Sequence, residues 1–431
     1  MRKMRDSGIA WIGVIPQDWE IVRTKSLYCS AKEIAGDRAD DFERLALTLN
    51  GVIKRSKEDS VGLQPEKFSG YQILKKGELV FKLIDLENVA TSRVGLSPYT
   101  GIVSPAYIVL SKQSRAKDLV VRYSMYHFLS MWQREIFNQM GDNGVRSSLN
   151  AKELLNIPHP FPSIYEQKRI VTFLDAQCAE IDTVLEKTRA SIEEYKKLKQ
   201  AVITQAVTKG IRGDRPMKDS GIEWIGDIPA EWDVVRIKKL FDYRNERNFK
   251  TLEEVNLISL YTDKGVVQHC DLDETTGNKA SNADGYKLVY ENDIVVNIIL
   301  CWMGAIGRSA YFGVTSPAYD VYSPKQKTNS KFYHYLFRTN GFSGDCYKVG
   351  RGIMAMRWRT YSDQFRAIKV VSPPQSEQEE IVEYLDEKCE GIDDLIAKKQ
   401  QYLIEIENYK KSLIYEYVTG KKEVKISVLA D

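Results

Sequence analysis

Cysteine and histidine are scarce in this chain of 431 residues, and their scarcity limits the chemistry that it can perform. The six cysteines are scattered and include no CxxC pair, so they predict reduced, buried thiols and exclude a disulfide framework. The four histidines lack the spacing of metal ligands. Neither residue type therefore predicts a metal centre.

Long apolar runs and an excess of one charge are also missing. No stretch reaches 18 apolar residues, and the Met1-Arg2-Lys3 start carries no apolar signal segment, so we expect a cytoplasmic protein without membrane contact. The net charge is only +3, whereas a protein that coats nucleic acid indiscriminately is usually more basic. Any nucleic-acid site must therefore be local.

The common catalytic motifs are absent, because the chain has no GxxxxGK[ST], HExxH or GxSxG pattern. Ser-Pro-Ala-Tyr occurs twice, at 104–107 and 316–319, and is similar to the [DNS]PP[YF] motif of amino-methyltransferases. However, alanine replaces the second proline in both copies, and no glycine-rich cofactor loop follows a buried strand. We interpret the tetrapeptide as a turn before a strand and predict no catalytic residue.

The chain contains an internal repeat. DSGIAWIGVIPQDWEIVR at 6–23 and DSGIEWIGDIPAEWDVVR at 219–236 are identical at twelve of eighteen positions. Weaker matches follow at nearly the same offset, including the two Ser-Pro-Ala-Tyr copies and a Glu-Gln pair at 166–167 and 377–378. Two copies of one unit are therefore predicted, each consisting of a head and a helix.

Two segments have the apolar spacing of long amphipathic helices that pack against another helix. Ser163 with Glu166 and Ser376 with Glu379 fit capping boxes at their starts. Each helix could span about 45 residues, or roughly 65–70 Å. The predicted partner or coiled-coil residues are Ile170, Leu174, Ile181, Leu185 and Ile192 in the first helix and Ile381, Leu385, Ile392, Ile396 and Leu403 in the second.

These patterns predict an α+β protein with two mixed α/β heads, an antiparallel coiled coil and an internal pseudo-two-fold repeat. The predicted boundaries are 1–160 for the first head, 161–210 for the central helix and 211–217 for a linker. The second head is expected at 218–373, the C-terminal helix at 374–420 and a tail at 421–431.

One loop in each head combines glycine with basic and amide side chains, a composition that suits contacts to phosphates and base edges. These loops are QMGDNGVRSSLNAK at 139–152 and KVGRGIMAMRWR at 348–359. Three further basic residues lie near other expected loop edges. The candidate DNA-binding residues are Lys82, Arg93, Asn143, Arg146, Ser148, Arg308, Lys348, Arg351, Arg357 and Arg359.

The doubled SGIxWIGxIPxxW frame, the P-x-x-x-E-Q-x-x-I-V-x-x-L-D helix starts and the Val-Thr-Lys-Gly and Val-Thr-Gly-Lys helix ends resemble the specificity subunit of type I restriction-modification systems. The resemblance covers nearly the whole chain. It implies two target recognition domains that each read one half of a bipartite, asymmetric site in double-stranded DNA. The paired helices would then set the spacer between the two halves.

The resemblance also implies partners and cofactors. A member of this family lacks catalytic activity and recruits two modification subunits, which use S-adenosylmethionine, and ATP-driven restriction subunits. No cofactor is expected in this chain itself. Two alternatives stay open from the residues alone, a coiled-coil adapter that does not bind DNA and a self-contained DNA methyltransferase.

Overall fold

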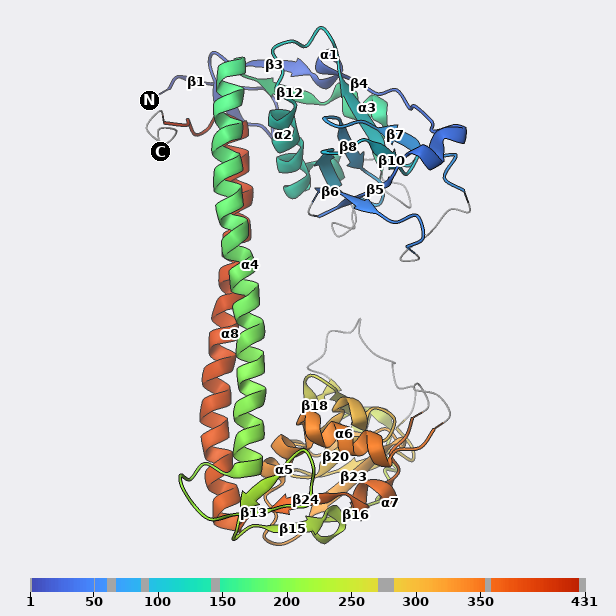
Figure 1. The fold of residues 1–431 in the computed structure, drawn as a ribbon, viewed down its shortest axis with the longest axis vertical. Helices are drawn as coiled ribbons and strands as arrows, with labels where there is room; N and C mark the ends of the chain where they lie inside the picture. The colour runs from blue at the N-terminus through green and yellow to red at the C-terminus, as the bar shows by residue number, and fades with distance from the viewer. Residues whose placement is uncertain are drawn as a thin grey trace. The chain divides into compact units, whose positions relative to one another are not determined.

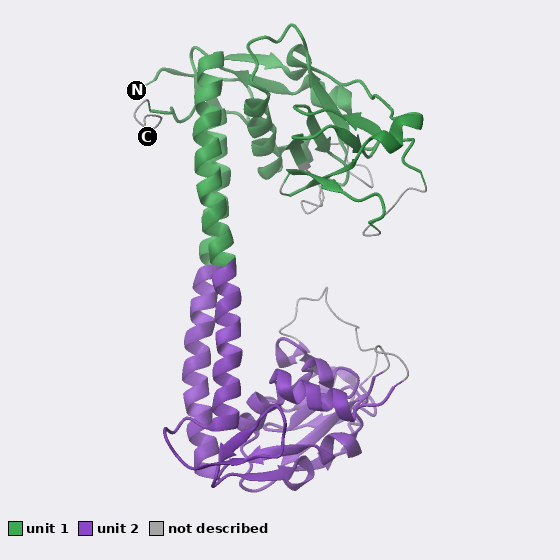
Figure 2. Cartoon of the chain, viewed as in Figure 1, with its two compact units in different colours: residues 1–189, 401–431 green, residues 190–400 purple. Residues whose placement is uncertain are grey.

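The computed structural model of this protein describes residues 2–49, 51–59, 67–86, 93–140, 148–269, 283–352 and 358–425. The chain divides into two compact units, Met1–Arg189 with Gln401–Asp431 and Ala190–Gln400 (Figure 2). Each unit joins a head of strands and short helices to parts of two long helices, α4 (Ile164–Lys209) and α8 (Gln375–Val418). The fold is mixed α+β. In the described ranges no helix is both long and apolar enough to cross a bilayer.

The first head is built from short elements (Figure 1). In chain order these are β1 (Met4–Asp6), β2 (Val14–Pro16), β3 (Glu20–Arg23), α1 (Thr24–Leu27), β4 (Tyr28–Cys29), η1 (Gly36–Asp41), β5 (Arg44–Thr48), β6 (Gly51–Arg55), β7 (Gln72–Leu74), β8 (Leu79–Lys82), β9 (Arg93–Leu96), β10 (Gly101–Val103), β11 (Ile108–Lys112), α2 (Val121–Gln133), η2 (Ile136–Gln139), α3 (Ala151–Asn156) and β12 (Pro158–Phe161).

The second head follows a similar order. Its elements are β13 (Met217–Asp219), β14 (Asp227–Pro229), β15 (Asp233–Arg236), η3 (Ile237–Lys239), β16 (Phe241–Arg244), η4 (Leu252–Glu254), β17 (Ile258–Tyr261), β18 (Gly265–Gln268), β19 (Lys287–Val289), β20 (Ile294–Asn297), η6 (Cys301–Met303), β21 (Ile306–Arg308), β22 (Gly313–Thr315), β23 (Tyr319–Pro324), α5 (Ser330–Phe337), α6 (Asn340–Val349), α7 (Ser362–Ala367) and β24 (Lys369–Ser372).

The two heads share one sheet topology. An antiparallel sheet has the order β4-β11-β8-β9 in the first head and β16-β23-β20-β21 in the second. In the first head β5 pairs with β6 and runs parallel to β10, which also pairs with β7. The second head has the corresponding pairs β17-β18 and β19-β22, joined by a parallel bridge between Leu257 and Val314.

The central strands β8 and β20 are continuous apolar runs, Leu79-Val80-Phe81 and Ile294-Val295-Val296. Each lies between two neighbouring strands, and these side chains are almost completely buried. Such runs are typical of strands covered on both faces. The heads are therefore organised around β8 and β20, and the carboxyl ends of these strands position the loops described below.

The apolar stripes of the long helices form part of the core in each unit. Ile170, Leu174, Ile181, Leu185, Ile192, Ile381 and Leu385 are buried, whereas Ile392, Ile396 and Leu403 are half-buried. Ile170, Leu174, Ile181 and Leu185 pack in the cluster that contains Trp19, and Ile381 and Leu385 pack in the cluster that contains Trp232. The repeated tryptophan frame thus covers the helices where each head joins them.

Ion pairs link the two helices within each unit. Arg189 pairs with Glu407 at 2.5 Å and Lys410 with Asp182 at 2.6 Å in the first unit. Lys199 pairs with Asp393 at 2.5 Å in the second unit. In the first unit the higher residue number on α4 pairs with the lower number on α8, so these helix segments run in opposite directions.

The starts of the long helices differ in their caps. Ser163 accepts a hydrogen bond from the backbone N–H of Glu166 at 3.3 Å, as the sequence predicts for a capping residue. The prediction for Ser376 is wrong, because α8 begins at Gln375 and Ser376 already lies in its first turn. There the carbonyl of Pro374 accepts from the N–H groups of Glu377 and Gln378.

Both long helices end at a glycine with a neighbouring lysine, and the order of these two residues differs between the helices. Gly210 and Gly420 both adopt positive φ, which glycine tolerates best at a helix end. Lys209 precedes its glycine and donates to the carbonyls of Ile225 and Asp227. Lys421 follows its glycine and donates to the equivalent carbonyls of Ile12 and Val14 at 2.8 and 3.0 Å. The swapped order therefore changes only the local cap.

A carboxylate at the start of each long helix, buried for Glu377 and partly buried for Glu166, connects the helix to the tryptophan frame. Trp19 Nε1 donates to Glu166 at 2.9 Å, and Trp232 Nε1 donates to Glu377 at the same distance. Arg2 also pairs with Glu166, and Arg215 lies 2.7 Å from Glu377. Each guanidinium also lies over the indole ring beside it, at 5.6 and 5.5 Å from the centroid. Each carboxylate thus accepts a hydrogen bond from an indole and has an arginine as its counter-charge.

The glutamine that follows each of these glutamates binds the head. Gln167 accepts from the N–H of Val120 at 2.9 Å and donates to the carbonyl of Pro162. Gln378 accepts from the N–H of Asn329 at 2.9 Å and donates to the carbonyl of Pro373. Because Val120 and Asn329 are the N-caps of α2 and α5, each glutamine fixes a head helix against a long helix.

Removal of the Glu377 carboxylate should destabilise the second unit strongly. Glu377→Ala leaves the largely buried Arg215 and Trp232 without their shared acceptor, so we expect a loss of about 3–5 kcal/mol in the free energy of unfolding. Glu380, which pairs with Arg212 on the exposed side of the same helix, provides the control. Glu380→Ala should cost less than about 1 kcal/mol. Chemical denaturation followed by circular dichroism measures both, and equal losses would contradict the prediction.

Two buried histidines in the first head form a neutral pair. The rings of His127 and His159 lie 4.5 Å apart, and both side chains are at most 1% exposed. His159 Nδ1 lies 2.7 Å from the carbonyl of Pro160, which can only accept, so Nδ1 carries the proton and Nε2 accepts from Ser124. Burial lowers the pKa of His159 to about 4 and the pKa of His127 well below its ordinary value.

This pair should make the first unit sensitive to acid. In the unfolded chain His159 binds a proton near pH 6.5, whereas in the folded unit it stays neutral until about pH 4. Its stabilising effect is therefore complete above pH 6.5 and decreases as the pH falls, by about 2 kcal/mol at pH 5. Urea denaturation at pH 7.5 and 5.0 tests this, with His159→Gln as the control that should show a smaller difference. Equal pH dependence in both proteins would refute it.

Candidate nucleic-acid interface

Three of the predicted DNA-binding residues come together at the carboxyl end of β8 in the first head. Lys82 is the last residue of β8 and pairs along the strand with Arg93 of β9. Two residues further on, Ile84 bridges to Ser148, and the N–H of Leu149 donates to the carbonyl of Leu83 at 3.0 Å. The backbone of Lys82, Arg93 and Ser148 thus converges at one edge. Asn143 and Arg146 lie outside the described residues.

The second head has the same anchor at the carboxyl end of β20. Here the N–H of Thr360 donates to the carbonyl of Ile298 at 2.8 Å, which corresponds to the Leu149–Leu83 bond of the first head. The Thr360 hydroxyl also donates to the carbonyl of Cys346 at 3.0 Å. One chain segment from each loop is therefore fixed to the end of the central strand in both heads.

Arg351 and Arg359 lie opposite each other at the base of the loop in the second head, and we call this pair the neck of the loop. Their backbones exchange two hydrogen bonds of 2.8 and 3.0 Å, so both residues lie beside each other, and both are exposed. In the described part of the chain neither guanidinium forms an ion pair, which leaves both available to an anion. Arg357 lies outside the described residues. Lys348 precedes the neck on α6 and forms an exposed ion pair with Glu223 at 3.0 Å.

A stack of aromatic rings supports this neck. Trp358 stacks on Tyr347 with centroids 5.0 Å apart, and its Nε1 donates to the carbonyl of Tyr347 at 3.0 Å. Tyr347 in turn contacts Trp302 at 5.6 Å. A Cβ atom on Gly350 would lie only 2.3 Å from Trp358 Nε1, so glycine is needed for the indole to approach the backbone. The loop neck is therefore fixed before any ligand binds.

Arg308 lies away from this neck. It pairs along the strand with Ile294, the first residue of β20, and not with the carboxyl end at Asn297. Its guanidinium donates to Asn292 at 2.6 and 2.8 Å, and its backbone N–H donates to His334 at 3.1 Å. Arg308 is therefore separated from the other candidate DNA-binding residues of the second head, because the strand register places it beside the start of β20.

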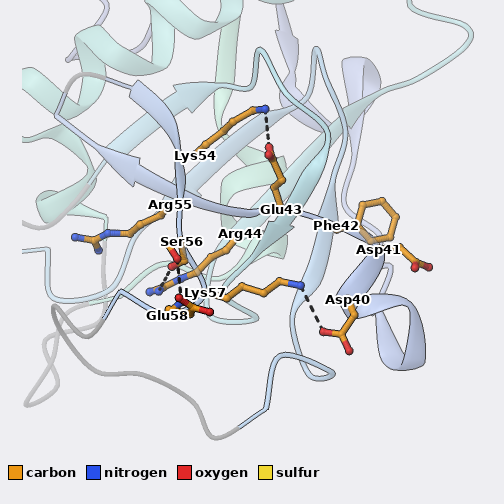
Figure 3. Close-up of a pocket in the computed structure, with 10 residues that line it drawn as sticks. All are labelled: Asp40, Asp41, Phe42, Glu43, Arg44, Lys54, Arg55, Ser56, Lys57 and Glu58. Carbon is orange, nitrogen blue, oxygen red and sulfur yellow. Dashed lines mark hydrogen bonds and ion pairs between the residues drawn. The ribbon is translucent and has the colours of Figure 1, made fainter.

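An open hollow beside the hairpin of β5 and β6 gathers charges of both signs (Figure 3). Its volume is about 600 Å³. Lys54 pairs with Glu43 at 2.6 Å and Lys57 with Asp40 at 3.5 Å, while Arg44 donates to the carbonyl of Ser56. Because the pairs largely neutralise each other, this hollow provides less attraction for phosphate than the neck of the second head.

We searched the described residues for clusters of metal ligands and for paired cysteines. No group of three or more His, Cys, Asp or Glu side chains there could hold a metal ion. The described cysteines are free, and Cys178, Cys301, Cys346 and Cys389 are buried as expected. The expectation is wrong for Cys29, which is exposed. It lies on the short edge strand β4, which pairs only with β11.

Both Ser-Pro-Ala-Tyr copies form turns. The N–H of Tyr107 donates to the carbonyl of Ser104 at 3.1 Å, and the N–H of Tyr319 donates to the carbonyl of Ser316 at 3.0 Å. Each turn leads into a strand, β11 in the first head and β23 in the second. The local geometry agrees with the structural interpretation of this tetrapeptide.

Sequence reasoning missed two groups at the interface and its support. The first is the apolar segment after β20, where Leu300 and Met303 are exposed beside Trp302. The available signal was a run of large apolar residues directly after a buried strand. The second is Asp175 and Asp386, which follow a seam leucine and accept from Tyr126 and Tyr335 at 2.6 and 2.7 Å. The repeated Leu-Asp pair was the signal.

The fold of this chain is shared with a solved structure. Two heads of one topology each present a fixed loop neck at the end of a central strand, and each is joined to two long helices. A chain of the same fold is found in a solved structure that concerns complex assembly and conformational transition of the type I restriction-modification system. Its TM-score is 0.69 at 13% identity, and the match covers 95% of this chain and 99% of that chain.

Family comparisons are more specific. Residues 229–408 match the family model of the type I restriction modification DNA specificity domain. Two relatives from Methanocaldococcus jannaschii, named MjaX and MjaVIII type I restriction enzyme specificity subunits, are 26% and 25% identical over 442 and 432 residues. These matches cover 96% and 95% of this chain and 96% and 94% of the relatives. The chain is thus similar over nearly its whole length to type I restriction enzyme specificity subunits, the family that its sequence motifs resemble.

Proposed function

We propose that this chain is the DNA-recognition subunit of a type I restriction-modification complex and that each head reads one half of a bipartite, asymmetric site. The observation that carries the proposal is that the two heads share one backbone arrangement but carry different residues at the carboxyl ends of β8 and β20. The anchor between the loop and the central strand is the same in both heads. The residues at this end are Lys82, Arg93 and Ser148 in the first head but Arg351, Arg359 and Trp358 in the second. Two such surfaces suit two different half-sites.

The long helices set the spacer in this proposal. A continuous helix of 46 residues, the length of α4, is about 70 Å long. We infer that α4 and α8 form one antiparallel coiled coil and that this pair of helices fixes the length of the spacer between the two half-sites. Buried seams and ion pairs between the two helices within each unit support this inference.

The helices also provide docking surface for the modification subunits. In the first unit Tyr402, Ile404 and Tyr409 of α8 are exposed, and Tyr402 and Tyr409 share a face because they are two turns apart. In the second unit Leu198 and Leu395 are exposed. Large apolar residues exposed on long helices suit a helical partner. S-adenosylmethionine and ATP would be bound by the partner subunits, and this chain would contribute no catalytic residue.

Mapping of methylated adenines tests the recognition role. The chain is expressed with its modification subunits, and the methylated motif is compared with that of cells lacking the chain. We expect a gapped, asymmetric motif that disappears on deletion. Exchange of residues 218–373 for the second head of another specificity subunit should change one half of the motif and leave the other half intact. If methylation does not depend on the chain in an assembled complex, the adapter alternative replaces this proposal.

Charge reversal tests the neck of the second head. Arg351→Glu with Arg359→Glu should weaken DNA binding by the assembled complex roughly tenfold or more, because two phosphate contacts become repulsive. The slope of log affinity against log salt should decrease by about 2. Arg308→Gln provides a control in the same head, since that residue lies at the opposite end of the strand pair. Fluorescence anisotropy across a salt series measures all three proteins. Unchanged binding by the double variant would exclude this neck from the interface.

A further inference from the structure

A small apolar surface follows β20 in the second head. Leu300 is 38% and Met303 is 53% exposed, although they flank Cys301, which is completely buried. The segment is tightly held, because the Asn297 side chain accepts from the N–H groups of Ile299 and Leu300 at 3.0 and 3.3 Å. Gly304 has a φ of +87° and returns the chain to β21. We name Leu300 and Met303 the apolar shelf.

The apolar shelf lies beside the neck that carries the exposed arginines. Trp302, which lies between the two shelf residues in the chain, contacts Tyr347, and Tyr347 stacks on Trp358. Trp358 is adjacent to Arg359, which pairs with Arg351. Figure 1 shows β20 and α6, which contribute to this region, within the same part of the second head. Two cationic side chains and two apolar side chains therefore share one end of the head.

The first head has different chemistry at the same position. After β8 the chain continues through Leu83, which is 1% exposed, and Ile84, which is half-buried and bridged to Ser148. The next residue is Asp85, which is exposed. A counterpart of the apolar shelf is thus missing from the described residues that follow β8. The two heads differ in polarity where they share a backbone framework.

The chemistry of the apolar shelf restricts what it can recognise on DNA. Isobutyl and thioether side chains form no strong hydrogen bonds, so they cannot distinguish the donors and acceptors of base edges. The thymine 5-methyl group is the apolar group that a base edge presents in the major groove. Arginines beside the shelf would hold the flanking phosphates and bring the base edge to it.

We propose that the second half-site contains a thymine whose 5-methyl group contacts Met303 and Leu300 in the major groove. This inference rests on the proposed DNA-recognition function and adds a specificity-determining contact to it. Met303 is the more exposed of the two and supplies most of the contact.

Replacement of thymine by deoxyuracil removes only the methyl group and tests the contact. Once methylation mapping has given the motif, each thymine of the second half-site is replaced in turn, and binding by the assembled complex is measured by anisotropy. For the wild-type chain we expect one position to weaken binding roughly fourfold, the equivalent of one buried methyl group. With Met303→Ala this penalty should disappear, while sequence-specific binding is retained.

Phe312→Ala provides the matched control, because Phe312 is an exposed apolar residue that packs on Tyr290 near the other end of the same strands. It should keep the wild-type deoxyuracil penalty. The inference is wrong if the second half-site contains no thymine, or if all three proteins show the same deoxyuracil penalty. Neither result contradicts the proposed function, which motif mapping tests separately. Equal weakening by Met303→Ala on thymine and deoxyuracil DNA would indicate insertion between base pairs or a protein contact, and it also overturns the methyl contact.

Discussion

The rest of the structure depends on a glutamate at the start of each long helix, which is buried in the second unit and partly buried in the first. Glu166 and Glu377 each accept a hydrogen bond from an indole and pair with an arginine that lies over that indole. A carboxylate removed from water is costly unless charge and hydrogen bonds are supplied, and here the arginine supplies the charge and the indole a hydrogen bond. Separation of the head from the helix start would therefore leave the glutamate without its arginine partner.

A glutamine and an aspartate further along each long helix add two more contacts to the head, and these contacts fix the orientation of a head helix against the long helix. Gln167 and Gln378 bind the N-caps of α2 and α5, and Asp175 and Asp386 accept from tyrosines one turn into those helices. Two points on each head helix are thus held by one long helix. Such an attachment leaves the carboxyl ends of β8 and β20 free to vary, because none of these residues lies there.

Variation is concentrated at that end. The shared anchor consists of backbone hydrogen bonds, which impose no side-chain identity. The second head carries two exposed arginines, an aromatic stack and an apolar shelf, whereas the first carries Lys82, Arg93 and Ser148. One backbone framework thus presents two chemically different surfaces, as the proposed reading of two half-sites requires.

The sequence by itself determined the duplication, the two long helices and most of their seam, because these depend on local periodicity and on repeated motifs such as Glu-Gln and Leu-Asp. It also indicated the loops at 139–152 and 348–359. Only the tertiary structure decided which candidates meet. Strand register places Lys82 opposite Arg93 and moves Arg308 to the far end of its strand. Register, the Trp302–Tyr347–Trp358 contacts and the exposure of Met303 arise from contacts between residues distant in sequence, which no local pattern records.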